Sequence, residues 1–501
     1  MSHLWRVFLT LLSLSSFGSA AQEVHEHSAP EKLGEVSFLI SCKPAVQQQF
    51  NRGVALLHSF AYSAAESAFQ GVAEQDHGCA MAHWGIAMTH FHQLWEPPIS
   101  PATMSLAQQE IQQAQQIGTS SKRERQFINA LGLIYQDAAT VPYRTRALNY
   151  EQAMSRLAAK NRKDTEAQVF YALALLATAS PTDKTHAKQK QAADLLEPLY
   201  SAYPRHPGIP HYLIHACDNA EMALKGLPAA RAYAKIAPSA PHALHMPSHI
   251  FTRLGLWQDS ITSNLAAKDA AQQQGDTGEE LHAMDYLVYA YLQSGWDSAA
   301  LEVIQQLRKM PEWNAGNFKI GYAATAMPVR YAVERGQWAD AAGILPPAAA
   351  PPHVVAIAVW ARGVGLARSG RATEPGAEVD KLGQIEQQLR RSGNDYWATQ
   401  TVILRREVMA WSAQADRKPE EAVALMRQAA DEEDAIEKLP VTPGPIVPAR
   451  EQLGDLLLEQ NRPVLAFKEF QTALVNAPGR RGALQGAARA AELSRQNQPS
   501  P

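Results

Sequence analysis

The chain has 501 residues, a formal net charge of −3 at pH 7 and 46% hydrophobic residues. This length exceeds one ordinary hydrophobic core, so we expect several domains or one long array of repeats. The hydrophobic content excludes a globally disordered chain, and the lack of a basic excess argues against a nucleic-acid-binding surface.

The first 21 residues are predicted to form a signal peptide. Arg6 supplies the positive start, residues 7–17 supply a short apolar stretch, and residues 18–21 are small, which is the pattern of a cleaved secretory signal. The alternative is a membrane anchor, but the apolar stretch falls short of the ~20 residues that span a bilayer. We therefore expect a periplasmic or secreted protein with no membrane span after cleavage, and a mobile polar tail over 22–40.

Three cysteines permit three single bridges in an oxidising compartment. Cys42 is predicted to lie just before a helix, and Cys79 just after the next one. Because a pair of antiparallel helices returns the chain to the end where it began, we predict a Cys42–Cys79 disulfide. Cys217 is left over, and we expect it to be a buried core thiol.

Helices are predicted nearly throughout, and they come in pairs. Over residues 50–88, Gly53, Ala65 and Phe69 stand at the spacing of a tetratricopeptide repeat, in which small residues let two helices approach and an aromatic ring fills the gap. A second segment with this spacing lies near the C-terminus and contains Gly454, Ala466, Phe470, Ala473 and Pro478. The sequence therefore predicts an all-α fold, a tetratricopeptide-like α-solenoid of antiparallel helix pairs.

Two central blocks complete this pattern: HPGIPHYLIHACD over 206–218 and APHALHMPSHIFTRLGLW over 240–257. With the two repeats, they make the chain resemble a family of secreted bacterial tetratricopeptide-repeat-like proteins over most of residues 40–490. The resemblance implies an α-solenoid that curls into a superhelix. The family has no established activity, so the resemblance implies no catalytic residue.

Proline-rich stretches divide the predicted array. We expect one helical array over 41–343 and a second over 354–491, with a proline- and alanine-rich break at 344–353, because these residues cannot continue a helix. Residues 492–501 are expected to fray. The stretch that begins at Val441, VTPGPIVP, is predicted to be a loop packed over the groove.

Histidines are concentrated in the centre of the chain. Six of the 17 fall between positions 206 and 249, and we predict that those of the central blocks lie on the first helices of successive pairs. In tetratricopeptide arrays these helices line the concave face, where ligands bind. The predicted metal ligands are His215, His245, His249 and Asp285. Further ligands, or acceptors that orient the ligands, are His211, Asp218, His242 and His282.

Two spacing arguments support this choice. Residues three or four apart share a helix face, as do His211 and His215, although Pro247 weakens the argument for His245 and His249. Counting back from the turn glycines also places His215, His245 and Asp285 at one level of the stacked helices.

These residues predict a divalent transition-metal site, with zinc, copper and iron not distinguished. Whether such a site is catalytic stays open, because the sequence contains no phosphate-binding glycine loop, no CxxC pair, no HExxH motif and no serine nucleophile elbow. The alternative is a non-enzymatic scaffold whose concave groove binds a peptide, a protein or a small molecule, with histidines as hydrogen-bonding groups. A smaller cluster, His83, His90 and His92, is predicted to be structural.

Overall fold

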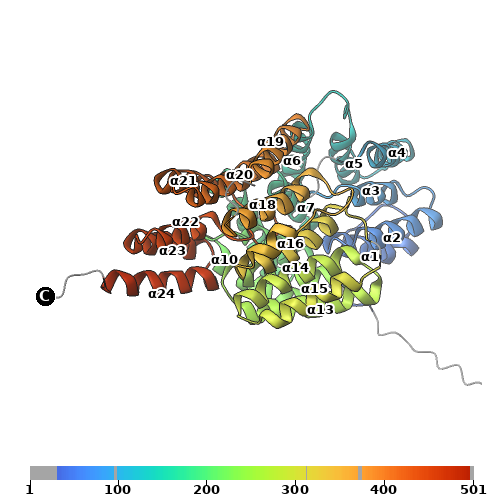
Figure 1. Ribbon diagram of the computed structural model, residues 1–501. Coiled ribbons are helices and arrows are strands. Elements are labelled where there is room, and N and C mark those ends of the chain that lie inside the picture. Colours follow the sequence, from blue (N-terminus) through green and yellow to red (C-terminus); the bar gives the residue numbers. More distant parts are fainter. Residues whose placement is uncertain (1–30, 95–98, 312, 371–374, 497–501) are drawn as a thin grey trace, which may run out of the picture. The chain divides into compact units, whose positions relative to one another are not determined.

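The computed structural model describes residues 31–94, 99–311, 313–370 and 375–496. Within these ranges the regular structure is entirely helical, with helices α1 to α24 and a short 3-10 helix (Figure 1). The all-α prediction is thus confirmed. None of the described helices is both long enough and apolar enough to cross a membrane.

Several predictions fall outside the described residues. They are the signal peptide at 1–21, the first part of the polar tail and the end of the C-terminal tail.

The first third of the chain forms helix pairs that enclose one apolar core. Side-chain caps fix several helix starts: Ser100 accepts a hydrogen bond from the amide of Thr103, and Asp164 accepts one from the amide of Ala167. The elements are η1 (Pro44–Val46), α1 (Gln47–His58), α2 (Tyr62–Gln75), α3 (Ala80–Thr89), α4 (Pro101–Ile117), α5 (Lys122–Tyr135), α6 (Tyr143–Lys160), α7 (Thr165–Ala177) and α8 (Ala187–Ala202).

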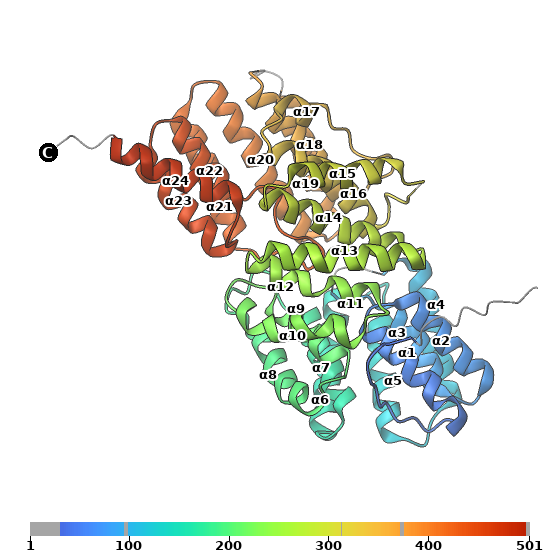
Figure 2. The same cartoon turned by 90° about the horizontal axis from the view of Figure 1, so that it is seen from below.

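The central helices carry the histidine blocks. Proline in the first turn starts α11 and α12, and the Asp276 carboxylate caps α14. The elements are α9 (Gly208–Cys217), α10 (Ala223–Ile236), α11 (Pro241–His245), α12 (Pro247–Arg253), α13 (Trp257–Gln274), α14 (Thr277–Gln293), α15 (Asp297–Lys309), α16 (Phe318–Glu334) and α17 (Trp338–Gly343). Figure 2 shows α11 and α12 in line next to α13, with α9 and α10 on their other side.

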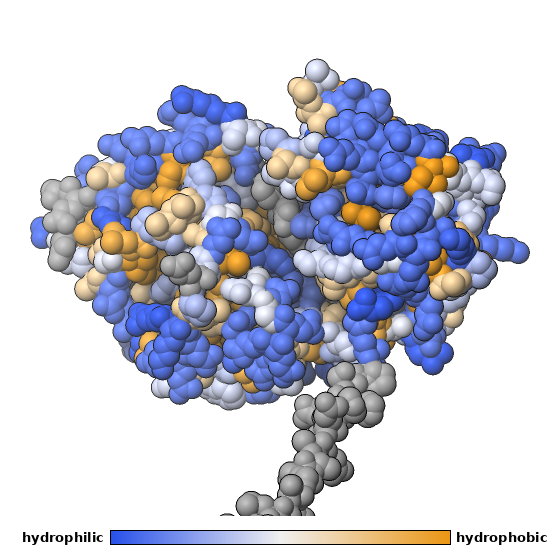
Figure 3. Space-filling view, turned by 90° about the vertical axis from the view of Figure 1, so that its right-hand side faces the viewer, coloured by the Kyte–Doolittle hydropathy of each residue, from blue (hydrophilic) through white to orange (hydrophobic). Residues whose placement is uncertain are grey.

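The C-terminal helices continue the pairing. They are α18 (Pro352–Arg368), α19 (Gly376–Arg391), α20 (Asp395–Ala415), α21 (Pro419–Asp434), α22 (Ala449–Glu459), α23 (Pro463–Asn476) and α24 (Arg481–Gln496). On the face shown in Figure 3, hydrophobic residues form separate patches among hydrophilic ones, as expected of helices that bury one side.

Tetratricopeptide packing is present at both predicted places. The Phe69 ring fills the space that a Cβ atom at Gly53 or Gly85 would occupy, at 2.7 and 2.5 Å from ring carbons. Phe470 makes the same contact with Gly454, where a Cβ atom would lie 2.6 Å from the ring. Because only glycine leaves room for the ring, the spacing found in the sequence reports a real packing unit, and the tetratricopeptide-like prediction is confirmed.

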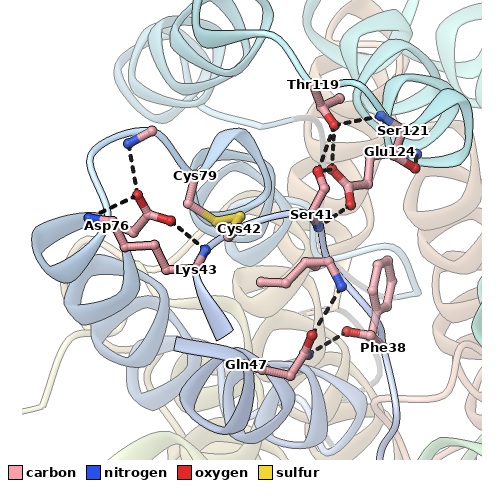
Figure 4. The surroundings of a disulfide bond; sticks show 12 residues. Phe38, Ser41, Cys42, Lys43, Gln47, Asp76, Cys79, Thr119, Ser121 and Glu124 are labelled. Atoms are coloured by element: carbon pink, nitrogen blue, oxygen red, sulfur yellow. Dashed lines mark hydrogen bonds and ion pairs between the residues drawn. A yellow bond between two sulfur atoms is a disulfide. The ribbon is translucent and has the colours of Figure 1, made fainter. Parts of the chain in front are cut away.

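The predicted disulfide is also confirmed. Cys42 and Cys79 are bonded, with their Cα atoms 5.0 Å apart (Figure 4). The bond ties the chain ahead of η1 to the start of α3, and Lys43 beside it donates its amide to Asp76 at 2.8 Å. Cys217 is free and buried, as predicted.

Two expected boundaries look different in the structure. Residues 32–40 contain no helix or strand, yet Phe38 is fully buried, with its ring 5.4 Å from that of Trp84. This stretch therefore packs into the first core instead of forming a loose tail.

Residues 344–350 contain no helix, but Ala341 and Val354 on either side belong to one apolar cluster. The break thus interrupts the helices without separating two cores.

Candidate metal centre

Four helices bring the central histidines together: α9, α11, α12 and α14. Helix α9 carries two histidines one turn apart on one face, and α14 presents His282 from its second turn. Pro247 ends one short helix and starts the next, so α11 and α12 follow each other with a break at Met246. Despite this break, His245 and His249 face each other.

Buried side chains with metal-binding atoms form three groups within the described ranges. In each group the candidate ligand atoms all lie within 4.8 Å of one another. The first group is His211, His215 and His242, the second group is His245, His249 and His282, and the third group is His58, Glu166 and His206.

In the second group, hydrogen bonds determine which ring nitrogen of His245 and of His249 carries the proton. His245 donates its Nδ1 proton to Asn264 Oδ1 at 2.7 Å. The orientation of the Asn264 amide is fixed because its Nδ2 donates to the carbonyl of Ser260. His249 donates its Nδ1 proton to Asp218 Oδ2 at 2.9 Å. In the neutral rings both Nε2 atoms therefore carry lone pairs, and these atoms are 3.1 Å apart.

The surroundings keep both rings neutral. Burial lowers the pKa of His249 to about 4, although Asp218 opposes the shift, and burial holds the pKa of His245 well below its usual value. Burial alone would raise the pKa of Asp218, but Lys438 and Arg253 hold that pKa well below its ordinary value. Asp218 is thus an ionised acceptor, and no proton is available to bridge the two Nε2 atoms.

The first group repeats part of this design. His211 donates its Nδ1 proton to the carbonyl of His58 at 2.6 Å, and His242 donates its own to Glu279 Oε2 at 3.1 Å. Each bond leaves the Nε2 atom of that ring as the metal-binding atom. His215 Nε2 lies 3.1 Å from His211 Nε2.

The first and second groups are neighbours. The ring centroids of His215 and His249 are 5.9 Å apart, and those of His242 and His245 are 6.0 Å apart. Six imidazoles therefore form one continuous buried layer, in which every ring is at most 8% exposed. The predicted convergence of imidazoles from successive helices is present, although the rings are buried between helices and do not line an open surface.

No family model and no curated protein matches this chain. Among solved structures, the chain is similar to the human IFIT1 dimer with m7Gppp-AAAA, at 10% identity and a TM-score of 0.38, over 83% of this chain and 90% of that one. It is also similar to the P58(IPK) TPR domain, at 12% identity and a TM-score of 0.22, over 91% of this chain and all of that one. Likenesses this distant assign no ligand to the histidine layer.

The structure places the four predicted ligands in different surroundings. His245 and His249 lie together, but His215 belongs to the neighbouring group. Asp285 belongs to none of the groups in the described part of the chain. Its carboxylate lies 3.8 Å from Arg330, and burial raises its pKa to about 6 against the opposing effect of that guanidinium.

Of the predicted acceptors, Asp218 binds His249, whereas His211, His242 and His282 belong to the groups themselves. Two acceptors were not predicted from the sequence, Asn264 and Glu279. Both are distant in sequence from the rings that they orient, so no local spacing could have indicated them.

The third group also went unpredicted, and its contacts are those of a hydrogen-bond network centred on Glu166. Glu166 accepts from His58 Nε2 at 2.8 Å and from His206 Nε2 at 2.9 Å. Both carboxylate oxygens are therefore occupied by imidazole protons, and the network needs no ion. His58 and Glu166 are 108 residues apart, so only the fold reveals their contact.

A loop between α21 and α22 covers the histidine layer. Pro440 and Val441 lie against His242, His249 and His282. Tyr286 ties this loop down by donating its hydroxyl proton to the carbonyl of Thr442 at 3.1 Å. The stretch from Val441 is thus a loop over the site, as predicted.

The smaller cluster, in α3 and just after its end, is different. His83 pairs with Glu110 at 2.7 Å, and His92 stacks on Tyr62 with a centroid distance of 3.9 Å. None of its three histidines belongs to a potential metal-binding group among the residues described. These contacts agree with a structural role.

Proposed function

We propose that the chain is an exported tetratricopeptide-like protein that holds a transition-metal ion at His245, His249 and His282. The observation that carries this proposal is the pair of Nε2 lone pairs that face each other at 3.1 Å, with both Nδ1 protons already donated elsewhere. Two lone pairs at this distance repel unless a cation lies between them. A bound metal ion converts that repulsion into two coordinate bonds.

The distances agree with coordination. Zinc binds imidazole nitrogen at about 2.0–2.1 Å, so two nitrogens of a tetrahedral site lie about 3.3 Å apart. The observed separation of 3.1 Å is close to this value. Metal-binding histidines also typically donate their other ring proton to a carboxylate or a carbonyl oxygen, as His249 and His245 do.

The donor set restricts the metal. Three neutral imidazoles suit zinc, copper, iron or nickel, whereas calcium and magnesium prefer oxygen ligands. Asp285 is left out of this proposed set because its carboxylate faces Arg330. Export to an oxidising compartment is part of the proposal, supported by the Cys42–Cys79 disulfide.

Elemental analysis tests the proposal. Untagged protein purified without chelator should retain at least one transition-metal ion per chain. His249→Ala should lower the metal content by one ion, and His83→Ala, a histidine outside the three groups, should leave it unchanged. Circular dichroism should show equal helicity for all three proteins. Substoichiometric metal in the parent protein would overturn the proposal and favour the alternative, a scaffold that binds a peptide or protein partner.

A further inference from the structure

We propose that the first group, His211, His215 and His242, holds a second metal ion, and that this ion keeps a coordination position open to a small neutral ligand. The inference rests on the proposed function, because it assumes the same chemistry in the neighbouring group. It adds a second ion, an access route and a class of ligand.

The donor geometry of the first group supports a second ion. The carbonyl of His58 and the carboxylate of Glu279 take the Nδ1 protons of His211 and His242. Each of these rings then offers only its Nε2 atom, and the three candidate ligand atoms lie within 4.8 Å of one another. One oxygen of the Glu279 carboxylate accepts from His242, and the other is paired with Lys319. Because both oxygens are used, this carboxylate orients His242 and is not itself a ligand.

Access differs between the two groups. The gap lined by His249, His282, Pro440 and Val441 leaves no room for a water molecule. In contrast, His215 lines a cavity of about 140 Å³. Closed metal sites are typically structural, whereas sites that bind or transform a ligand keep one position open. The open position therefore belongs to the ion at His215.

The cavity walls indicate the kind of molecule that fits. Part of the lining is apolar and includes Leu94, Leu176 and Leu439. The charges at the cavity are paired: Asp218 accepts a hydrogen bond of 2.7 Å from Lys438, and Glu437 pairs with Lys184 and Arg253. A neutral molecule is thus favoured over an ion.

Gln189 adds a specific requirement. It lines the same cavity, and its Oε1 atom is buried with no hydrogen-bond partner among the described residues. A buried acceptor without a donor is costly. The ligand should therefore be a small neutral compound that carries a hydroxyl or N–H donor for Gln189 and a metal-binding oxygen or nitrogen.

A cobalt(II) titration of the metal-free protein tests the second ion. The parent should bind two ions per chain, and His215→Ala should bind one. Circular dichroism shows whether the variant is folded, and His215→Gln provides a second variant of nearly equal size. One ion in the parent would overturn this inference and leave the proposed function standing, whereas no bound ion would overturn both.

Acetohydroxamic acid tests the open position, because it is small and neutral and carries both a donor and metal-binding oxygens. It should change the visible spectrum of the two-cobalt parent but not that of His215→Ala. Gln189→Leu should keep two cobalt ions. Its affinity for acetohydroxamic acid should be about 5–10-fold lower than that of the parent, the loss expected for one hydrogen bond. Acetate, which lacks the donor, should bind both proteins equally. An unchanged parent spectrum, or equal acetohydroxamic acid affinity in Gln189→Leu, would overturn the inference.

Discussion

Two regions of this molecule bury polar side chains in opposite ways. Between the C-terminal helices, Arg480 is fully buried, and its guanidinium donates to Glu334 and Glu451 at 2.7–3.1 Å. In this network the buried guanidinium and the two carboxylates satisfy each other. In the histidine layer, His245 and His249 are equally buried, yet their Nε2 lone pairs face each other.

We interpret the first arrangement as structural, and the proposed metal site accounts for the second. A satisfied polar network holds helices in place without any further component. A network in which acceptors face acceptors is complete only when a cation is added. Burial and polarity alone therefore do not indicate a binding site in a helical repeat protein. The direction of each hydrogen-bond donor and acceptor must also be considered.

The largest effect is expected from a substitution in the Arg480 network. Arg480→Met would leave Glu334 and Glu451 buried without their cation, so the free energy of unfolding should fall by about 3–5 kcal/mol in a denaturant titration. Arg481→Ala, which removes a partly exposed guanidinium paired with Asp297, should cost less than about 1 kcal/mol. Equal losses in the two variants would contradict the idea that the Arg480 network is structural.

The pH dependence of the stability of the metal-free protein tests the histidine layer. The pKa of His249 falls from its ordinary value of 6.5 to about 4 on folding, so protonation favours the unfolded chain. The stability contributed by the neutral ring is complete above pH 6.5 and is lost as the pH falls toward 4, by up to about 3 kcal/mol. Denaturant titrations in chelator should show this loss, and His249→Gln should lack that part of it. An identical profile in parent and variant would contradict a neutral, buried His249.

Metal binding should raise the free energy of unfolding through the histidine layer, and the Arg480 network should not contribute to this gain. A free zinc concentration 100 times the dissociation constant should raise the free energy of unfolding by about 2.7 kcal/mol. Chelator should reverse the gain. Arg480→Met should show the same gain as the parent, whereas the doubly substituted His245→Ala/His249→Ala should show none at that site. A similar gain in the double variant would place the metal elsewhere.

The smallest effect concerns an orienting residue. Asn264→Ala removes the acceptor that fixes the His245 proton on Nδ1, so zinc affinity should fall about 10–100-fold. Thr262→Ala, an exposed position on the same helix, is the matched control and should leave affinity unchanged. Isothermal titration calorimetry measures both, and equal affinities would show that Asn264 does not position the ring.

Local spacing predicted much of the fold. Gly53 with Phe69 and Gly454 with Phe470 mark real packing units, because a ring that enters the space of a missing Cβ atom depends on residues within one helix pair. The Cys42–Cys79 bond was predictable for the same reason. In both cases the residues that matter lie within about one repeat of each other.

The register of the histidine layer was not predictable by counting from glycines. That count aligned Asp285 with His245, whereas the structure brings His282, one turn earlier, to a centroid distance of 4.2 Å from His245. For His215, the count also assumed that the first helix ends at its turn glycine. Helix α9 ends at Cys217 instead, and Gly226 lies inside α10.

Long-range partners were hidden for a related reason. Asn264, Glu279 and the His58 carbonyl orient rings on other helices. The contacts of Glu279 and of the His58 carbonyl depend on how successive pairs stack, which spacing within one pair does not specify. Asn264 lies on α13, which packs against α11 and α12 within one pair, so its contact depends on how the helices of that pair pack.

Anomalous diffraction from a crystal of the metal-loaded protein tests the central claim most directly. The account predicts an anomalous peak between His245 and His249, at about 2.0–2.1 Å from each Nε2 atom if the metal is zinc. A peak outside the histidine layer, or an ordered layer without any peak at full metal loading, would contradict it.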